Sequence, residues 1–249
     1  MKLRILTFAL LVIVFGCTKN SGKADMGPAN SGDVGKGGSL AKFTIAGSFL
    51  YVVDGFDLKV YDISKPTAAQ SKNIVSVGFP VETIFPFKDK LFIGSRDGMF
   101  IYSLDDPAMP SKLGEARHVR SCDPVVANDS VSYITLRGGS PCGPAEDGLY
   151  IYDIKNIESP VQKGFLSITS PLGLGLQDTV VFVCREELGL TVVNVKNTGD
   201  PKVMYTLNDA SYKDVIPYDD LLICYTSAGL LLYDMTDLNK LVKVGGVKY

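Results

Sequence analysis

Few side chains in this chain could do chemistry, and none of them forms a common catalytic motif. The sequence has one histidine and five cysteines, so it offers no histidine pair for a metal ion. It also lacks a Gly-x-Ser-x-Gly elbow and a His-Glu-x-x-His pattern. The remaining candidates are the arginines and cysteines beyond residue 16 and a set of scattered carboxylates.

A five-residue pattern that occurs five times predicts the elements that carry these candidates. An apolar residue, a spacer, two apolar residues and a small polar residue recur at 58–62, 99–103, 149–153, 190–194 and 230–234. The fourth positions, 61, 102, 152, 193 and 233, are separated by 41, 50, 41 and 40 residues. A period near 40 in strand-like segments is typical of a β-propeller, with one blade per repeat. We therefore predict an all-β, five-bladed propeller over residues 41–249, with about 41 residues and four antiparallel strands per blade.

A second landmark confirms the register of the repeat. A turn residue precedes an apolar strand in each repeat, at Gly47, Asp89, Asp129, Asp178 and Asp219. Both landmarks place one insertion in the third repeat, near 138–146. The first blade begins on an inner strand and the last ends on an outer one. We expect the ring to close by packing of the first and last blade faces, or by a strand that the N-terminal segment adds.

The repeat resembles the LVIVD repeat of bacterial envelope proteins, which is named for the same five-residue run. The stretches 121–126, 133–139 and 142–143 resemble a segment of the longer LVIVD lipoproteins. The resemblance covers the chain from Ala41 onward. It implies a propeller in the cell envelope, and it brings no catalytic residue, because the family has no agreed reaction or ligand.

The N-terminus is typical of an exported, lipid-anchored protein. Lys2 and Arg4 precede an apolar run from Ile5 to Phe15, as in a secretory signal peptide over 1–16. The break at 14–17 resembles the lipobox of bacterial lipoproteins, which implies lipidation of Cys17; an ordinary signal with a chance cysteine is the alternative. Residues 17–40 are rich in Gly, Ser, Asn and Lys, which predicts a flexible tether. The anchor predicts a protein attached to a membrane of the bacterial envelope. No acidic cluster closely follows Cys17, which favours the outer membrane.

The cysteines beyond Cys17 divide into two pairs. Cys122 precedes the inner strand of the third blade, and Cys142 lies in the inserted loop of that blade. Both positions lie on one face of the ring, which predicts a disulfide in an oxidising compartment. Cys184 and Cys224 lie in apolar strands and point to opposite faces of their respective blades, which predicts two buried core thiols.

The arginines gather on the same face of the ring as this cysteine pair. The repeat places Arg96, Arg117, Arg120, Arg137 and Arg185 there with the only histidine, His118. Arginine forks suit carboxylates and phosphates, so this face is a candidate binding surface for an envelope protein or an acidic or polar ligand. The alternative is local pairing with nearby carboxylates, which are Asp97, Asp123, Glu186 and Glu187.

Carboxylates on this face keep an enzyme hypothesis open. A glycoside-processing enzyme needs at least two carboxylates around its substrate. Here Asp57, Asp97, Asp123, Asp147 and Glu187 lie mostly in outer loops. The equivalent inner-strand positions of the five repeats, Lys42, Ile84, Pro124, Gly173 and Asp214, supply one carboxylate. The charge balance, 23 basic against 27 acidic residues once Lys2 and Arg4 are removed, does not favour nucleic acid.

The sequence therefore predicts a membrane-anchored, non-catalytic binding propeller that needs no cofactor or metal. A glycoside-processing enzyme is the first alternative. A structural scaffold in an envelope complex is the second.

Overall fold

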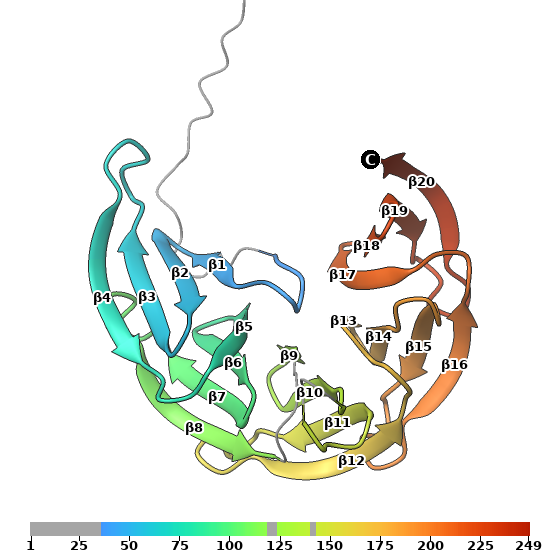
Figure 1. Ribbon diagram of the computed structural model, residues 1–249, viewed down its shortest axis with the longest axis horizontal. Coiled ribbons are helices and arrows are strands. Elements are labelled where there is room, and N and C mark those ends of the chain that lie inside the picture. The colour runs from blue at the N-terminus through green and yellow to red at the C-terminus, as the bar shows by residue number, and fades with distance from the viewer. Residues whose placement is uncertain (1–35, 119–123, 140–142) are drawn as a thin grey trace, which may run out of the picture.

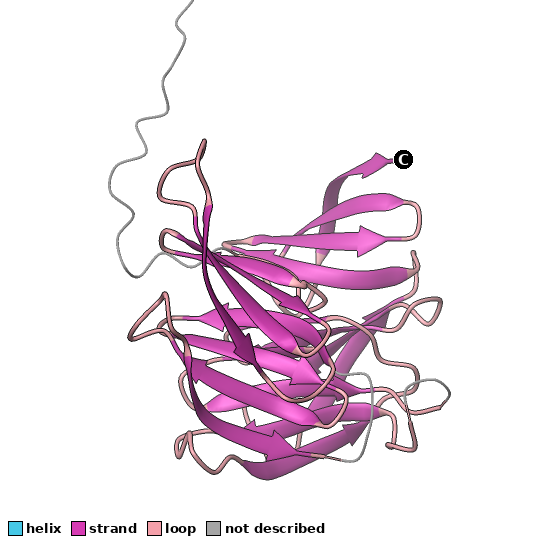
Figure 2. Cartoon of the chain, turned by 60° about the vertical axis from the view of Figure 1, so that its left-hand side comes forward, coloured by secondary structure: helices cyan, strands magenta, loops and turns pink. Residues whose placement is uncertain are grey.

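The chain folds into five small antiparallel sheets arranged around an axis, as the sequence predicts (Figure 1). The computed structural model describes residues 36–118, 124–139 and 143–249. These residues form 20 strands, four in each sheet, and no helix (Figure 2). None of the described residues forms a helix that could cross a membrane.

Each sheet is one blade made from a contiguous stretch of sequence. In every blade the first strand is innermost and the fourth outermost (Figure 1). Blade 1 contains β1 (Phe43–Ala46), β2 (Phe49–Asp54), β3 (Asp57–Asp62) and β4 (Gln70–Ser76). Blade 2 contains β5 (Val81–Phe87), β6 (Lys90–Ser95), β7 (Gly98–Ser103) and β8 (Ser111–Arg117). Blade 3 contains β9 (Val125–Ala127), β10 (Val131–Leu136), β11 (Gly148–Asp153) and β12 (Val161–Ser167). Blade 4 contains β13 (Leu174–Gln177), β14 (Val180–Cys184), β15 (Leu190–Asn194) and β16 (Lys202–Leu207). Blade 5 contains β17 (Tyr212–Tyr218), β18 (Leu221–Thr226), β19 (Gly229–Asp234) and β20 (Val242–Lys248).

The five-residue pattern forms the third strand of every blade, and its polar last residue caps the turn that follows. The side chain at this position accepts a hydrogen bond from the backbone N–H two residues later, the local bond that Asp, Asn and Ser make in turns. The five acceptors are Asp62, Ser103, Asp153, Asn194 and Asp234. The apolar positions of the pattern that face a neighbouring blade are buried, whereas Leu230, at the ring opening, is 36% exposed. One short motif thus specifies both a strand and its end.

A bulge recurs beside this pattern in all five blades. The register between the third and fourth strands shifts just before the fourth pattern position, for example between Ile101 and Tyr102 and between Ile151 and Tyr152. A bulge increases the local bend and twist of the strand that carries the extra residue. The outer strand of each blade therefore curves around the rim of the ring.

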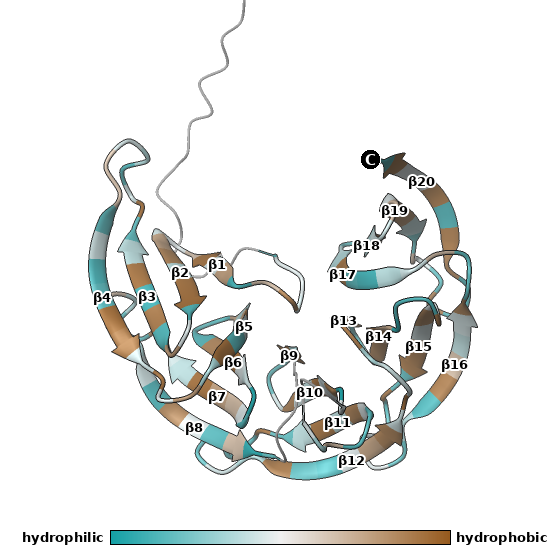
Figure 3. Ribbon diagram, in the orientation of Figure 1, coloured by the Kyte–Doolittle hydropathy of each residue, from teal (hydrophilic) through white to brown (hydrophobic). Residues whose placement is uncertain are grey.

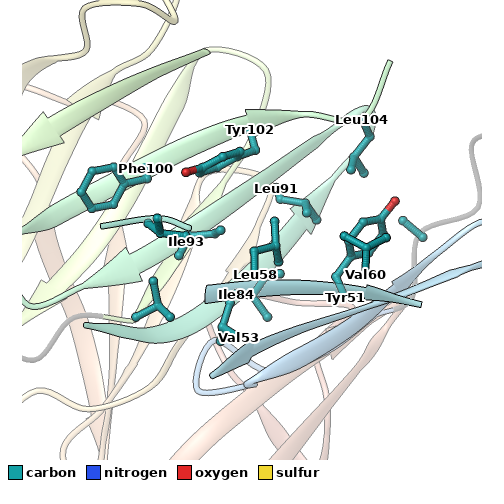
Figure 4. Packing of buried hydrophobic residues seen from close by; sticks show 13 residues of the cluster. Tyr51, Val53, Leu58, Val60, Ile84, Leu91, Ile93, Phe100, Tyr102 and Leu104 are labelled. Carbon is teal, nitrogen blue, oxygen red and sulfur yellow. The ribbon is translucent and has the colours of Figure 1, made fainter. Parts of the chain in front are cut away.

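Apolar side chains fill four interfaces between consecutive blades. Between blades 1 and 2, for example, Tyr51 and Leu58 belong to one cluster with Ile84 and Leu91, and all four side chains are fully buried (Figure 4). Similar clusters join blades 2 and 3, 3 and 4, and 4 and 5. The strand β14 is buried at all five positions because blades cover both of its faces, as its continuously apolar sequence predicts.

The first and last blades do not pack face to face, which corrects the expected ring closure. Strands β2 and β18 have apolar sequences, yet their burial alternates, because one face of each blade has no neighbour. On β1, Phe43 is 63% exposed and Ile45 is 44% exposed. Residues 36–42, the described part of the N-terminal segment, add no strand either, since blade 1 has the order β1-β2-β3-β4 and blade 5 the order β17-β18-β19-β20. Blades 1 and 5 carry apolar residues like the other blades (Figure 3), and the ring is open between them (Figure 1).

Candidate functional site

A cavity of about 500 Å³ lies where the inner strands converge. It is lined by residues at the ends of β5, β9, β13 and β17 and by Lys36 and Gly37. Most of its wall is apolar, with Phe85, Phe87 and Leu176 among the lining residues. Lys36 and Asp178 are the titratable side chains of the lining. A concave, mostly apolar cavity of this size is the usual form of a small-molecule site.

The cavity opens on the face opposite the arginines. Its lining comes from the ends of the inner strands, where the chain turns into the second strand of each blade. The arginine-bearing loops precede the inner strands or join the second and third strands. Because neighbouring strands run antiparallel, these two sets of loops lie at opposite ends of the ring.

Lys36 lies at the edge of this cavity. Its ammonium is 3.8 Å from the Asp219 carboxylate and 5.1 Å from the centre of the Tyr218 ring. Both partners are exposed, so this pair adds little to stability. The pair instead fixes residue 36 beside the ends of the inner strands, where the described chain begins.

A buried carboxylate, Asp214, joins blade 5 to the residues that precede blade 1. Its Oδ1 accepts hydrogen bonds from the Ser39 hydroxyl and the Val215 N–H, both at 3.0 Å. Its Oδ2 accepts one from the Leu40 N–H, also at 3.0 Å. The Ser39 oxygen in turn accepts the Leu174 N–H of blade 4 at 2.7 Å. We call this group, Ser39, Leu40 and Asp214, the clasp.

Close backbone packing and desolvation define the environment of the clasp. A Cβ at Gly38 or at Gly173 would overlap the Asp214 carboxylate, so both positions require glycine. Burial raises the pKa of Asp214 to about 6, although hydrogen bonds from the Ser39 hydroxyl and from the backbone N–H groups of Ser39, Leu40 and Val215 act in the opposite direction. None of the ion pairs found among the described residues includes Asp214.

The described arginines of the predicted binding face have local partners. The Arg96 Nε donates to Glu82 at 2.8 Å, and the Arg117 Nε donates to Glu115 at 2.8 Å. Arg117 also lies over the Phe79 ring, 4.2 Å from its centre. The Arg185 Nε donates to the Thr169 carbonyl at 3.0 Å. These contacts match the alternative of local bracing, with partners other than those expected from the sequence.

The rest of this face is only partly described. Arg137 and His118 also make interactions, and Arg120 lies outside the described residues. Arg96 and Arg185 directly follow the second strands of blades 2 and 4, as predicted. A role of this face in binding stays a prediction.

The loop carboxylates of the enzyme hypothesis lie on separate blades. Asp57, Asp97, Asp147 and Glu187 belong to blades 1, 2, 3 and 4. Asp147 accepts the Gly138 and Ser170 N–H groups at 2.8 and 2.7 Å and so organises the inserted loop. Asp123 lies outside the described residues. Within the described residues, no group of three or more His, Cys, Asp or Glu side chains could hold a metal ion.

The buried cysteines lie where the sequence predicts. Cys184 of β14 and Cys224 of β18 are fully buried free thiols in the interface between blades 4 and 5. Burial raises the pKa of both thiols well above the usual range. Cys17, Cys122 and Cys142 lie outside the described residues, so lipidation and the disulfide stay predictions.

Sequence reasoning missed the clasp and the cavity. Ser39 falls in the predicted tether, yet it is only 1% exposed and hydrogen-bonded to a residue 175 positions away. Two signals in the sequence point toward this packing: Asp214 is an acidic residue within an otherwise largely apolar inner strand, and Gly38 and Gly173 are glycines. Neither signal identifies its partner.

Comparisons with known proteins show the fold alone. No protein-family model and no curated protein matches the chain. Among solved structures, it is similar to a protein from Lactobacillus plantarum (TM-score 0.63, 12% identity, 81% of this chain and 68% of that one). It is also similar to apo AztD from Citrobacter koseri (TM-score 0.58, 13% identity, 85% of this chain and 60% of that one). A third similar structure is a hypothetical selenium-binding protein from Sulfolobus tokodaii (TM-score 0.58, 12% identity, 82% of this chain and 59% of that one). The fold is shared. This chain spans only about three fifths to two thirds of the length of those proteins.

Proposed function

We propose that this protein is a non-catalytic binding propeller, anchored to a membrane of the bacterial envelope through Cys17, that takes an apolar ligand into its axial cavity. The observation that carries the proposal is the cavity itself, about 500 Å³ with a mainly apolar wall built by the inner strands. Sites of this form bind small molecules mainly by removing apolar surface from water. The LVIVD-type repeat and the lipobox-like segment support the envelope assignment.

The tether and the cavity are related in this proposal. Nineteen peptide bonds separate Cys17 from Lys36, and a flexible chain of that length spans roughly 25 Å on average. Lys36 lines the axial cavity. A lipid on Cys17 therefore holds the cavity end of the ring near the membrane surface, and the arginine face points away from it.

Binding of an uncharged fluorescent apolar probe, N-phenyl-1-naphthylamine, tests the ligand proposal. We expect saturable binding that is weakened about tenfold or more by Leu176→Gln, since a polar group would then lie in the apolar wall. Val203→Gln is the matched control, because Val203 is 50% exposed on the outer strand β16. Equal affinity of both variants, with both folded, would contradict the proposal.

The anchor is tested separately by metabolic labelling with a palmitate analogue. We expect label on the wild-type chain and none on Cys17→Ser. Label that persists on the variant would exclude Cys17 as the acylated residue.

A further inference from the structure

The two blade faces at the ring opening carry side chains whose counterparts elsewhere in the ring are buried. Tyr225 and Leu230 pair across β18 and β19, as Cys184 and Leu190 do across β14 and β15. Cys184 and Leu190 are 0% exposed, whereas Tyr225 is 42% and Leu230 is 36% exposed. The free face of blade 5 therefore carries side chains of the kind that the other blades bury in their interfaces, but no blade covers it.

Blade 1 repeats this relation on the other side of the opening. Phe43 pairs with Val52 across β1 and β2, as Ile84 pairs with Ile93 across β5 and β6. Ile84 and Ile93 are fully buried, and Phe43 is 63% exposed. Contiguous exposed apolar surface on a folded protein usually marks a site of interaction.

The clasp prevents the two faces from covering each other. Gly38, Leu40 and Ala41 lie against the free face of blade 5 and line a groove of about 300 Å³ with Ile216, Ile223 and Leu230. For the faces to meet, this segment would have to leave, and Ser39 would lose its bonds to Asp214 and Leu174. The groove holds a few side chains. It is too small for a four-stranded blade of a second copy.

The charge at the groove defines the chemistry of its occupant. Asp214 is the charged residue of the groove lining, with 8% of its surface exposed, and the Lys213 ammonium lies over the ring of the lining residue Tyr225, 5.6 Å from its centre. Asp214 interacts only with uncharged donors, which are the Ser39 hydroxyl and the backbone N–H groups of Ser39, Leu40 and Val215, so no group in the clasp neutralises its charge. Covering this carboxylate with apolar groups alone would add desolvation cost, whereas a cation would offset that cost.

We propose that the groove between residues 38–41 and the free face of blade 5 docks an extended segment of another protein, in which apolar side chains flank a lysine or arginine. The apolar side chains pack on Ile223, Tyr225 and Leu230. The basic group lies over the exposed edge of the Asp214 carboxylate and offsets its charge. The groove shares only Ile216 with the lining of the proposed axial ligand site, so the two proposals are tested by different variants and either can fail alone.

Three synthetic strand peptides test the proposal, identical except for a central lysine, glutamine or glutamate between two valines. Affinities for the intact protein are measured by fluorescence anisotropy. We expect the lysine peptide to bind at least about tenfold more tightly than the glutamate peptide, a ratio that falls as salt is added. The peptides should not displace N-phenyl-1-naphthylamine from the axial cavity.

Matched variants localise the effect. Leu230→Lys places a positive charge on the groove wall and should abolish or reverse the preference for the lysine peptide. Val203→Lys adds the same charge on the outer strand of blade 4 and should leave the preference intact. Both positions are exposed, so both variants should fold, which circular dichroism checks.

Four results would overturn the proposal. They are equal affinity for the three peptides, no binding of any of them, a preference unchanged by Leu230→Lys, and a stable dimer in sedimentation that Leu230→Lys dissociates. The last result would assign the groove to a second copy of this chain.

Discussion

At the scale of single residues, Asp214 is the side chain on which the account depends most. It joins blade 5 to the segment before blade 1 through hydrogen bonds to Ser39 and Leu40. It does so as a buried carboxylate without an ion-pair partner among the described residues, a costly arrangement when the group is ionised. Residues that lower stability in this way are often retained for function.

The pH dependence of stability measures that cost. The fold raises the pKa of Asp214 to about 6 from the ordinary 3.8, so the fold favours the protonated form. The contribution of this group to stability is therefore full below pH 3.8 and is lost as the pH rises to about 6. We expect Asp214→Asn, which cannot ionise, to gain about 2 kcal/mol relative to wild type between pH 4 and pH 7.

Urea unfolding of the two proteins at both pH values provides the measurement. The asparagine amide also changes stability by an amount that does not depend on pH. This amount cancels, because the test uses only how the difference in free energy of unfolding changes between pH 4 and pH 7. A difference between variant and wild type that is the same at pH 4 and pH 7 would show that the Asp214 carboxylate is not desolvated.

At the scale of elements, each repeat is specified by local chemistry. The five-residue pattern sets the third strand, its polar residue caps the next turn, and the turn residues found from the sequence lie in or beside the first turn of each blade. Such features could be predicted because each depends on neighbours in the chain. The insertion in blade 3 was likewise predicted, and residues 137–147 connect β10 to β11.

Cysteine reactivity tests the register of the strands. Cys184 and Cys224 are buried between blades 4 and 5, and burial raises the pKa of both thiols. Because the thiolate is the reactive form, we expect iodoacetamide to label them only after unfolding. Cys122 and Cys142 should be labelled only after reduction, if they form the predicted disulfide. Peptide mapping that finds Cys184 or Cys224 labelled in the folded protein would contradict the strand packing.

The features that the sequence could not provide join distant positions. Ser39 and Asp214 are 175 positions apart, and the residues around each of them do not indicate that the two side chains form a hydrogen bond. The axial cavity combines the ends of four inner strands with Lys36, and its shape depends on how the blades are arranged. The sequences of β2 and β18 are as continuously apolar as that of β14, yet each of these two strands is buried on one face only. A sequence pattern does not show whether a neighbouring blade is present.

At the scale of the whole molecule, the five-bladed ring is open between blades 5 and 1. The space around three glycines at one position of the repeat shows where a neighbouring blade is present. Gly114 and Gly164 face their partners on the third strand, and a Cβ at either would overlap a carbonyl in the next blade, that of Ile157 or Thr198. Gly245 holds the same position in blade 5, where a Cβ would meet only the Leu232 side chain, at 3.6 Å.

The most direct test compares the stability of Gly164→Ala with that of Gly245→Ala by urea unfolding. In an open ring, Gly164→Ala should lower the free energy of unfolding by about 1–3 kcal/mol, because the new methyl group forces two blades apart. Gly245→Ala should stay within about 0.5 kcal/mol of wild type, as expected for a surface position. If Gly245→Ala destabilises the protein as much as Gly164→Ala, blade 1 packs on blade 5, and the ring is closed.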